Sequence, residues 1–385
     1  MVGLAPGLRI KATCIRAGFQ AAAVLVFLSL LVPLPGRAAA GETIHMTDIM
    51  NRDVVLQAPA RRLVLGAGRH VLAIALIHPD PVSLVVGWRD DFTRDPATFS
   101  DWSERFPAIG AIPVVGGAAG AGLDVEAITN LKPDLVVLSL YDAEAPGTVR
   151  SIAILEKLGI PVLVIDFFSH PLSNSLPSLR MLGRALGVEP AAERFATFYD
   201  DRLERVRGRI AERDDLFRPR LFMHVHAGGM PCCSTAGSGV FGEMIELAGG
   251  HNAGAERIAG LYGDITLEQL IVDDPTLYVA TGGAHLARGG GLVLGPGTSE
   301  AQARESFARL LSTPGLDQLT AVRKNHAFAI WHMFNDTPAH IVMIEWLASI
   351  LHPELFSDID PAETLVRLNE DFLAVPMSGT FWLNP

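Results

Sequence analysis

Side chains that could bind a ligand are concentrated just after the short apolar runs that predict β-strands. Aromatic residues make up only 7% of the chain, yet they recur at these strand ends together with arginine and histidine. Aromatic faces suit large planar or chelated ligands, and arginine suits carboxylates and cation–π contacts. Ordinary packing in the core is the alternative for each single residue, so the prediction of a ligand site rests on all of these residues taken together. The predicted ligand-binding residues are Arg69, Trp88, Arg89, Tyr141, Phe167, His226, His285, Trp331 and Phe334.

Two neighbouring cysteines, Cys232 and Cys233, form a second group with chemical potential, while the third cysteine, Cys14, lies near the N-terminus. Adjacent Cα atoms are about 3.8 Å apart across a trans peptide, closer than the roughly 4.4–6.8 Å of most disulfides. A bond between the pair would therefore be strained and rather easily reduced. Three interpretations stay open: two unpaired thiols, a vicinal disulfide in an oxidising compartment, or metal ligation, which the lack of CxxC and HxxxH spacing disfavours.

The sequence lacks the motifs that would indicate common enzymes. It contains no Gly-x-Ser-x-Gly elbow, no Gly-x-x-x-x-Gly-Lys phosphate loop and no His-Glu-x-x-His zinc motif. His224 and His226 alternate along a predicted strand, so they point to opposite faces and do not simply ligate one metal ion. These absences argue against an enzyme, so we expect no catalytic residues, no metal-ligating set and no cofactor.

The composition excludes several classes of protein. Lys and Arg total 31 against 42 Asp and Glu, which gives a formal net charge of −11, and 49% of the residues are hydrophobic. An acidic chain without a basic stripe is not expected to bind nucleic acid. The high apolar content, without long blocks of like charge, excludes a disordered chain. At 385 residues the chain is long for one hydrophobic core, which predicts two lobes.

The first 40 residues have the features of an export signal. Arg9, Lys11 and Arg16 precede an apolar stretch of 14 residues, 21–34, which is short for a membrane span. Residues 38–40 are all alanine and offer a cleavage site. We therefore predict a cleaved signal peptide at 1–40 and a soluble, exported protein with a net charge of −15. A membrane-anchor helix is the alternative.

From residue 60 onward, short apolar runs alternate with helix-like segments, and this order predicts an α/β fold with parallel, doubly wound sheets. The runs are brief, unbroken and rich in Val, Leu and Ile, as strands buried on both faces are. The predicted strands are 62–65, 83–86, 135–138, 162–165, 220–225, 277–280 and 327–330. The predicted helices are 69–77, 125–131, 148–158, 241–248, 267–272, 300–311 and 339–351.

Two similar passages, one in each half of the chain, indicate a repeated architecture. Residues 124–137 and 264–279 each begin with aspartate, place a glutamate in the first helical turn and reach a strand after a proline. The passages therefore put Glu126 and Glu268 at matching positions, one in each half. Favourable first-turn charge is the alternative reason for each glutamate.

Between the halves, residues 190–213 predict one long helix. Phe195, Phe198 and Tyr199 begin a series of apolar residues at three- and four-residue steps, and Pro190 suits the first helical position. Twenty-four residues at 1.5 Å each would span roughly 36 Å, so we predict a rigid strut between lobes rather than a surface helix of one lobe. The predicted domains are the signal peptide 1–40, an N-terminal α/β lobe 41–170, a linking helical segment 171–216 and a C-terminal α/β lobe 217–385.

Five short motifs occur in order along the chain: LKPDLVVL at 131–138, LEKLGIPV at 155–162, LGRALG at 182–187, EMIELAGGHN at 243–252 and WLASILHPELF at 346–356. Together they resemble the periplasmic substrate-binding proteins of ABC importers that carry ferric siderophores, haem and cobalamin. The resemblance implies two Rossmann-like lobes with parallel sheets, joined by a long rigid α-helix, with the ligand cleft between the lobes. It also implies that one surface glutamate per lobe docks on permease arginines, and Glu126 and Glu268 are the positions that match.

We therefore predict a monomeric periplasmic protein that captures a ferric-siderophore-like complex and delivers it to ABC permease subunits at the inner membrane. Haem or a corrinoid is the alternative ligand within the same class, because Tyr141, His226, His285 and His332 are available to ligate haem iron. An exported metal-dependent hydrolase is the alternative from a different class, and it would be recognised by turnover.

Overall fold

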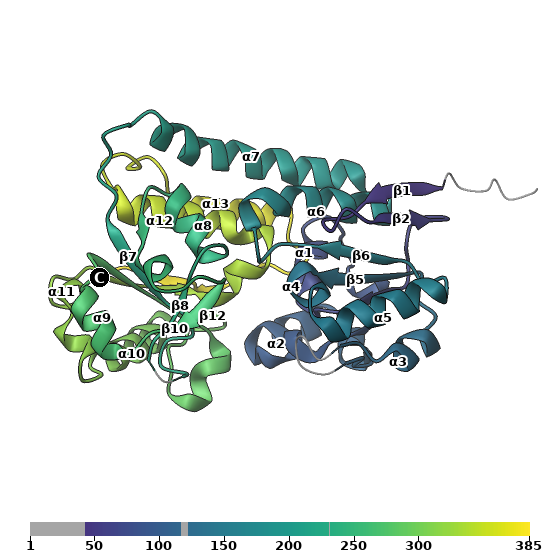
Figure 1. Ribbon diagram of the computed structural model, residues 1–385, viewed down its shortest axis with the longest axis horizontal. Helices are drawn as coiled ribbons and strands as arrows, with labels where there is room; N and C mark the ends of the chain where they lie inside the picture. The colour runs from purple at the N-terminus through teal and green to yellow at the C-terminus, as the bar shows by residue number, and fades with distance from the viewer. Residues whose placement is uncertain (1–42, 117–121, 231) are drawn as a thin grey trace, which may run out of the picture. The chain divides into compact units, whose positions relative to one another are not determined.

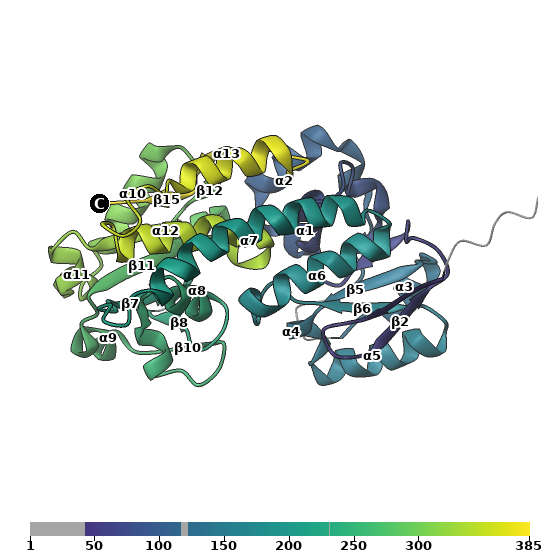
Figure 2. The ribbon, with the colours of Figure 1, turned by 90° about the horizontal axis from the view of Figure 1, so that it is seen from above.

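The computed structural model describes residues 43–116, 122–230 and 232–385, and residues 41–385 form one compact unit (Figures 1 and 2). The predicted signal peptide, 1–40, lies outside the described residues. Within those described ranges, no helix combines the length and the apolar character that crossing a membrane requires.

The N-terminal lobe is built on a four-stranded sheet in the order β4-β3-β5-β6, in which all pairings are parallel. One face packs α1 and α6 against alternate strand residues such as Leu135 and Val137, and the other face packs α3 and α5 against Val136 and Leu138. Burial on both faces is the reason that these strands are unbroken apolar runs. The strands are β3 (Leu63–Leu65), β4 (Val85–Trp88), β5 (Leu135–Ser139) and β6 (Val162–Ile165).

Helices and a hairpin complete this lobe (Figure 1). The hairpin pairs β1 (Ile44–Thr47) with β2 (Asp53–Leu56) in antiparallel register. The helices are α1 (His70–Ala75), α2 (Pro96–Arg105), α3 (Val125–Asn130), α4 (Leu140–Ala143) and α5 (Pro146–Lys157). Short 3₁₀ turns lie at Val82–Leu84, Asp90–Arg94 and Pro107–Ala111.

The C-terminal lobe is built on a seven-stranded sheet in the order β10-β8-β7-β11-β13-β15, with β9 also paired to β7. Its central strands β7, β11 and β13 are parallel, whereas β8, β10 and β15 add antiparallel edges. The strands are β7 (Arg220–His224), β8 (Ser234–Ala236), β9 (His251–Asn252), β10 (Tyr262–Asp264), β11 (Leu277–Gly282), β13 (Ala327–Trp331) and β15 (Trp382–Leu383). A separate pair joins β12 (Gly295–Pro296) to β14 (Gly379–Thr380).

Helices cover both faces of this second sheet, with α8, α12 and α13 on the side of α7 and α9 and α10 on the other side (Figure 1). Their bounds are α8 (Phe241–Leu247), α9 (Leu267–Asp273), α10 (Glu300–Leu311), α11 (Thr320–Arg323), α12 (Ile341–Leu351) and α13 (Pro361–Asp371). Short 3₁₀ turns follow the ends of β11 and β13, at Ala284–Gly289 and His332–Asp336.

Two consecutive helices connect the sheets. The first, α6 (Pro171–Leu186), ends at Gly187, whose φ of +68° is a left-handed conformation that glycine adopts without strain. The second, α7 (Glu189–Ala211), packs on α6 at one end and on α12 at the other (Figures 1 and 2). The predicted fold class, two parallel-sheet lobes joined by a long helix, is confirmed.

Candidate ligand-binding cleft

Three histidines meet at the carboxyl ends of the three central strands of the C-terminal lobe. His226 follows β7, His285 lies in the turn after β11, and His332 directly follows β13. Because β7, β11 and β13 are neighbours in the sheet, their ends bring these side chains together. The His226 Nδ1 atom lies 3.0 Å from His285 Nε2, and the His226 and His332 ring centroids are 3.8 Å apart. We call these three residues the histidine cluster.

Backbone contacts hold the histidine cluster in place. His226 has a left-handed conformation with a φ of 51°, which turns the chain away from β7, and its N–H donates to Thr281 Oγ1 at 3.0 Å. The same Thr281 hydroxyl lies 3.0 Å from His332 Nδ1. One side chain from β11 therefore positions two members of the cluster.

The cluster is uncharged at neutral pH. Burial, reinforced by His285 and Arg69 nearby, lowers the pKa of His226 to about 4. Burial likewise lowers the pKa of His285, and it lowers the pKa of His332 well below the ordinary value of 6.5. Neutral imidazoles keep a nitrogen lone pair, which is the form that ligates metals. The cluster can therefore offer nitrogen ligands to a metal centre.

Arg69, from the N-terminal lobe, faces the histidine cluster across the cleft. Its Nε donates to Asp91 at 2.9 Å within its own lobe, and its Nη1 forms an ion pair with Asp336 of the other lobe. Burial alone would lower the pKa of Arg69, but Asp336 and Asp91 raise it, so the guanidinium stays protonated. Arg69 therefore joins the two lobes at the centre of the cleft.

A second, fully buried ion pair lies deeper in the N-terminal wall. Arg89 Nη1 is 2.9 Å from Asp142, and the Ser139 hydroxyl donates to the same carboxylate at 2.7 Å. Both charged side chains are 4% exposed, so neither is freely available to a ligand. Arg89 instead fixes the short helix α4 after β5, which carries Tyr141.

Two cavities occupy the cleft, and Arg69 lines both. The first, of about 240 Å³, lies between the lobes and is lined by Arg69, Leu72, Asp91, Phe92, Arg94, Asp95, Thr98, His226, His285, Trp331 and Met333. The second, of about 160 Å³, is lined by Ala67, Arg69, His70, Arg89, Asp91, Arg94, Ser139, Tyr141, Asp142, Phe167, Phe168 and Asp336. Each is smaller than the roughly 300–1,000 Å³ of typical small-molecule sites. Arg69, Asp91 and Arg94 line both cavities, so these three side chains lie where the two spaces meet.

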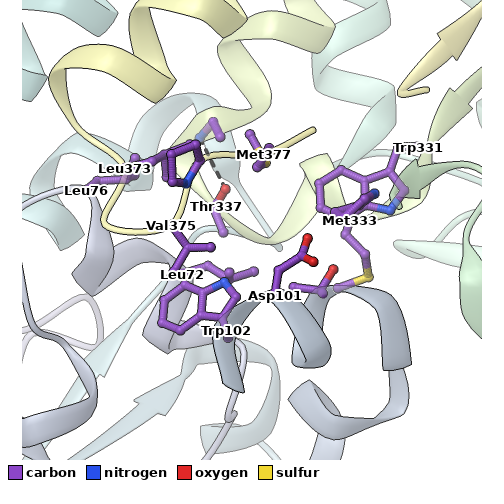
Figure 3. A pocket seen from close by; sticks show the side chains of 14 residues that line it. Leu72, Leu76, Asp101, Trp102, Trp331, Met333, Thr337, Leu373, Val375 and Met377 are labelled. Carbon is purple, nitrogen blue, oxygen red and sulfur yellow. Dashed lines mark hydrogen bonds between the residues drawn. The ribbon is translucent and has the colours of Figure 1, made fainter. Parts of the chain in front are cut away.

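An apolar seam lies beside the first cavity (Figure 3). There Trp331 and Met333 of the C-terminal lobe approach Leu72 and Trp102 of the N-terminal lobe, and Val375 closes the side. The seam holds only about 30 Å³ of free volume, close to the space of one water molecule. It is therefore mainly a contact between the lobes.

The structure brings most of the predicted ligand-binding residues to the two cavities but not all of them. Those that line a cavity are Arg69, Arg89, Tyr141, Phe167, His226, His285 and Trp331. Trp88 is instead 1% exposed and packs on Phe92, with ring centroids 5.6 Å apart. Phe334 is fully buried against Trp331 and Phe381. Trp88 is the last residue of β4 and Phe334 lies in the turn after β13, but their rings turn into the cores, where burying large apolar surface is favourable.

Other cavity-lining residues were missed by the sequence prediction. Asp91, Arg94 and Asp95 belong to the turn after β4, and Asp336 ends the turn after β13. His332, which the sequence suggests only as a haem ligand, packs on the cavity-lining His226. These residues lie three to seven positions past a strand end or follow a predicted residue directly, so a wider window after each strand would have found them.

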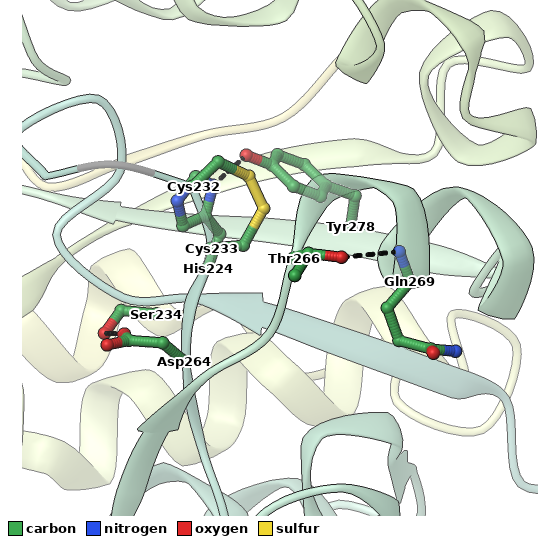
Figure 4. Close-up of a disulfide and its surroundings, with 8 residues drawn as sticks. All are labelled: His224, Cys232, Cys233, Ser234, Asp264, Thr266, Gln269 and Tyr278. Atoms are coloured by element: carbon green, nitrogen blue, oxygen red, sulfur yellow. Dashed lines mark hydrogen bonds between the residues drawn. A yellow bond between two sulfur atoms is a disulfide. The ribbon is translucent and has the colours of Figure 1, made fainter.

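The remaining predicted residues lie away from the cleft. Cys232 and Cys233 are joined by a disulfide next to His224 (Figure 4). Glu126 and Glu268 are exposed in the first turns of α3 and α9.

Comparisons with known proteins identify the family and the fold of this chain. A family model described as periplasmic binding protein matches residues 75–331. Two curated relatives, cobalamin-binding proteins from two strains of Halobacterium salinarum, are 28% identical over 183 residues, which are 47% of this chain and 46% of each relative. The chain thus matches about half the length of those curated relatives.

Solved structures share the fold. A TroA-like periplasmic binding protein from Veillonella parvula has a TM-score of 0.77 at 24% identity, covering 89% of this chain and 99% of that one. A molybdate-binding protein from Haemophilus influenzae has a TM-score of 0.65 at 18% identity, with 87% and 99% covered. A periplasmic haem-binding protein from Pseudomonas aeruginosa has a TM-score of 0.53 at 21% identity, with 77% and 94% covered. The chain therefore belongs to the periplasmic binding protein family, has the TroA-like fold of two parallel-sheet lobes, and is a binding protein rather than an enzyme.

Proposed function

We propose that this protein is the periplasmic solute-binding component of an ABC importer and that it captures a metal chelate, with an iron complex as the first candidate. Membership of the family supports the transport role. The cleft supports the choice of ligand, because its two walls offer different chemistry: neutral nitrogen ligands on one side, and aromatic and charged groups on the other.

The histidine cluster is the observation that carries this proposal. Its members are neutral, and His226 and His285 line the first cavity. Imidazole is a common ligand of iron, copper, nickel and zinc. A chelate that leaves one coordination position open, or exchanges one donor, would take that donor from the cluster.

The charges of the cleft favour a chelate of low net charge. Its cavities are lined by three arginines, Arg69, Arg89 and Arg94, and by four aspartates, Asp91, Asp95, Asp142 and Asp336. Since the histidines are neutral, these side chains nearly cancel. A strongly anionic ligand would have to displace aspartates from the arginines, which costs the free energy of their ion pairs.

Aromatic rings supply the apolar surface for the organic part of the chelate. Tyr141 and Phe168 are 5.6 Å apart between ring centroids, and Phe168 and Tyr262 are 5.7 Å apart. Tyr141 is 51% exposed, so it offers its ring to a ligand without rearrangement. Contacts of this kind are typical of sites for large, partly apolar ligands.

A corrinoid is the second candidate, and the cobalamin-binding relatives from Halobacterium salinarum are the observation that favours it. A ligand of that size would need the two cavities to join. Arg69 lines both of them, so its release from Asp336 would be part of corrinoid binding.

Docking on the importer is the second part of the proposed function. Glu126 and Glu268 are exposed, and one lies in each lobe. Since neither lines a cleft cavity, they are free to pair with arginines of the permease while the ligand is bound. We assign them as the docking residues.

Absorption and calorimetric titrations test the choice of ligand. The purified protein is titrated with a neutral ferric trihydroxamate, a strongly anionic ferric tricatecholate, haemin and aquocobalamin. We expect the ferric trihydroxamate to bind more tightly than the tricatecholate. His226→Ala should weaken this binding by about 1–3 kcal/mol, whereas His326→Ala, an exposed histidine outside the cleft, should leave it unchanged. Tight binding of aquocobalamin alone would show that the ligand is a corrinoid and not an iron complex. Binding of none of the four would contradict a chelate ligand.

A further inference from the structure

A buried histidine lies beside the two bonded cysteines, outside the cleft. One ring nitrogen of His224 and the Sγ atoms of Cys232 and Cys233 all lie within 4.8 Å of one another. His224 and Cys233 are buried, and Cys232 is partly exposed. Figure 4 shows the imidazole next to the disulfide, with the Tyr278 hydroxyl close to both. Two sulfurs and one nitrogen therefore converge on one point of the C-terminal lobe.

Regular structure holds two of these three side chains. His224 ends β7, and its Nδ1 atom is 2.6 Å from the Tyr278 hydroxyl on the neighbouring strand β11. Cys233 lies directly before β8 and exchanges two backbone hydrogen bonds with Ile265, of 2.8 and 3.0 Å. Side chains anchored to strands in this way keep their geometry better than those of a free loop.

The group formed by His224, Cys232 and Cys233 is separate from the ligand-binding cleft. Among the described residues, both cleft cavities are lined by side chains other than these three. His226, two positions further along, belongs to the cleft, so the two histidines serve different sites although they are close in sequence. Burial lowers the pKa of His224 to about 4, so this imidazole is also neutral.

We propose that the reduced forms of Cys232 and Cys233, together with His224, make a binding site for a thiophilic monovalent metal ion, and that this ion is Cu⁺. In the oxidised protein the sulfurs are bonded to each other, and the site does not exist. Metal binding at this position is therefore conditional on the thiol–disulfide state of the pair.

The ligand types select the metal. Thiolate sulfur is a soft donor that favours Cu⁺ and Zn²⁺ over magnesium, calcium or manganese. Structural Zn²⁺ sites are almost always four-coordinate, whereas this cluster offers three protein ligands. Three donors are enough for Cu⁺. The Tyr278 hydroxyl contacts the His224 imidazole, and outer partners of this kind commonly orient ligating histidines.

Formation of the site has two balanced steps. A small dithiol attacks the partly exposed Cys232 sulfur; the Cys232–Cys233 bond breaks, and the dithiol forms its own disulfide while two electrons and two protons pass to the cysteines. Cu⁺ then displaces the two thiol protons and binds both sulfurs and the imidazole nitrogen. Metal binding therefore releases two protons.

Anaerobic competition for Cu⁺ tests the proposal. The full chain carries Cys14→Ala, so that the pair supplies its only thiols, and it competes with a chromogenic Cu⁺ chelator before and after reduction by a dithiol that is then removed. We expect one Cu⁺ per chain after reduction and none before it. X-ray absorption of the copper protein should show two sulfurs and one nitrogen, a result that does not depend on a variant that could fail to fold.

Variants supply the controls. Cys232→Ser should abolish stoichiometric binding, and His224→Gln should weaken it by about 10–100-fold, whereas the exposed His326→Ala should have no effect. Equal binding by the oxidised and reduced proteins would overturn the proposal. So would reduced protein that binds no Cu⁺, or a copper spectrum with sulfur ligands only.

Discussion

Burial decides the charge of the histidines in and around the cleft. His70 and His226 both line cavities, and burial lowers the pKa of each to about 4. His340, beneath α7, is fully buried, and its pKa is lowered to about 3. The folded protein therefore keeps these imidazoles neutral over a pH range in which an unfolded chain would protonate them.

Acid should consequently destabilise the protein from mildly acidic pH downward. Between pH 6.5 and about 4 the unfolded chain binds protons at these histidines and the folded chain does not, so the free energy of unfolding must fall as pH falls. Each buried histidine can contribute roughly 3 kcal/mol across that window. Urea unfolding at several pH values measures the loss, and NMR of the imidazole carbons, with free N-acetylhistidine as a control, assigns it. Imidazoles that titrate near pH 6.5 in the folded protein would contradict this prediction.

Arg69 is the residue on which the two lobes meet. Its partners Asp91 and Asp336 come from different lobes, and their side chains are 12% and 11% exposed. Removal of the guanidinium would leave both carboxylates poorly solvated without their main partner. Arg69 is thus a contact between the lobes and, with Asp91 and Arg94, lies between the two cavities.

Arg69→Met should lower the free energy of unfolding by about 1–3 kcal/mol, because hydrogen bonds to charged groups are lost. Asp336→Asn should cost less, and the double variant should show a coupling energy of about 0.5–3 kcal/mol. Urea unfolding of the unchanged protein, the two single variants and the double variant gives the double-mutant cycle. Arg94→Met is the matched control, since Arg94 pairs with Asp90 at the surface, where such pairs are worth about 0–1 kcal/mol. Additive effects of Arg69→Met and Asp336→Asn would refute the direct coupling.

For single residues, the sequence predicted the position along the fold better than the direction in which the side chain points. Arg69, His226 and Trp331 lie in the cleft because parallel strands end at a common edge, which alternating runs reveal. Trp88 and Phe334 lie at equivalent positions but pack inward, because the orientation of a ring depends on partners such as Phe92 and Phe381 that are distant in sequence or in another element. The pairing of Arg69 with Asp336 could not be predicted from the sequence either, because the two residues belong to different lobes.

At the scale of elements, α7 carries the connection between the lobes. Its buried residues include Phe195, Phe198 and Tyr199, and the two phenylalanines pack on Phe372 beyond α13. Tyr199 is 1% exposed, and its hydroxyl lies 2.7 Å from His340 Nε2, just before α12. Apolar packing fixes the helix broadly. The buried contact with His340, together with the polar contacts of Arg202 with Thr364 and of Arg209 with Asp358, fixes its register on the C-terminal lobe.

Tyr199→Phe should therefore destabilise the protein more than the loss of one exposed hydroxyl would. The variant leaves the buried His340 nitrogen without its partner, which costs about 1–3 kcal/mol. Thermal and urea unfolding measure this, and ligand affinity should stay unchanged because neither residue lines a cleft cavity. His45→Ala, which alters an exposed strand residue, is the control. A stability equal to that of the unchanged protein would show that the hydrogen bond contributes nothing.

Elements with strong periodicity were predictable, and short edge elements were not. The strand over 162–165 and the helix over 300–311 have the predicted bounds, because a run of Val, Leu and Ile and a regular apolar stripe are local signals. The antiparallel edges β8, β10 and β15 have three, three and two residues, too few for a period to appear. β4 begins at Val85 and not at Ser83, because Val82–Leu84 forms a 3₁₀ turn.

At the scale of the whole molecule, the two lobes present related surfaces. Glu126 lies in the first turn of α3 after the N-cap Asp124, and Glu268 lies in the first turn of α9 after the N-cap Thr266. Both helices lead through a proline to a central strand of their lobe, β5 or β11. The repeated passage seen in the sequence is therefore a repeated structural unit, and each copy exposes one glutamate.

Charge reversal at both glutamates should abolish transport without affecting ligand capture. Glu126→Lys with Glu268→Lys replaces attraction to permease arginines by repulsion, while the cleft is left untouched. Surface ion pairs are individually weak, about 0–1 kcal/mol, so the double variant should be clearly worse than either single one. Uptake assays and co-purification with the permease measure the effect, and titration of the ligand confirms an intact cleft. Glu104→Lys with Glu370→Lys, which reverses one exposed glutamate in each lobe, is the control for net charge. Normal uptake by the first double variant would refute the assignment, and loss of uptake in both would trace the effect to charge alone.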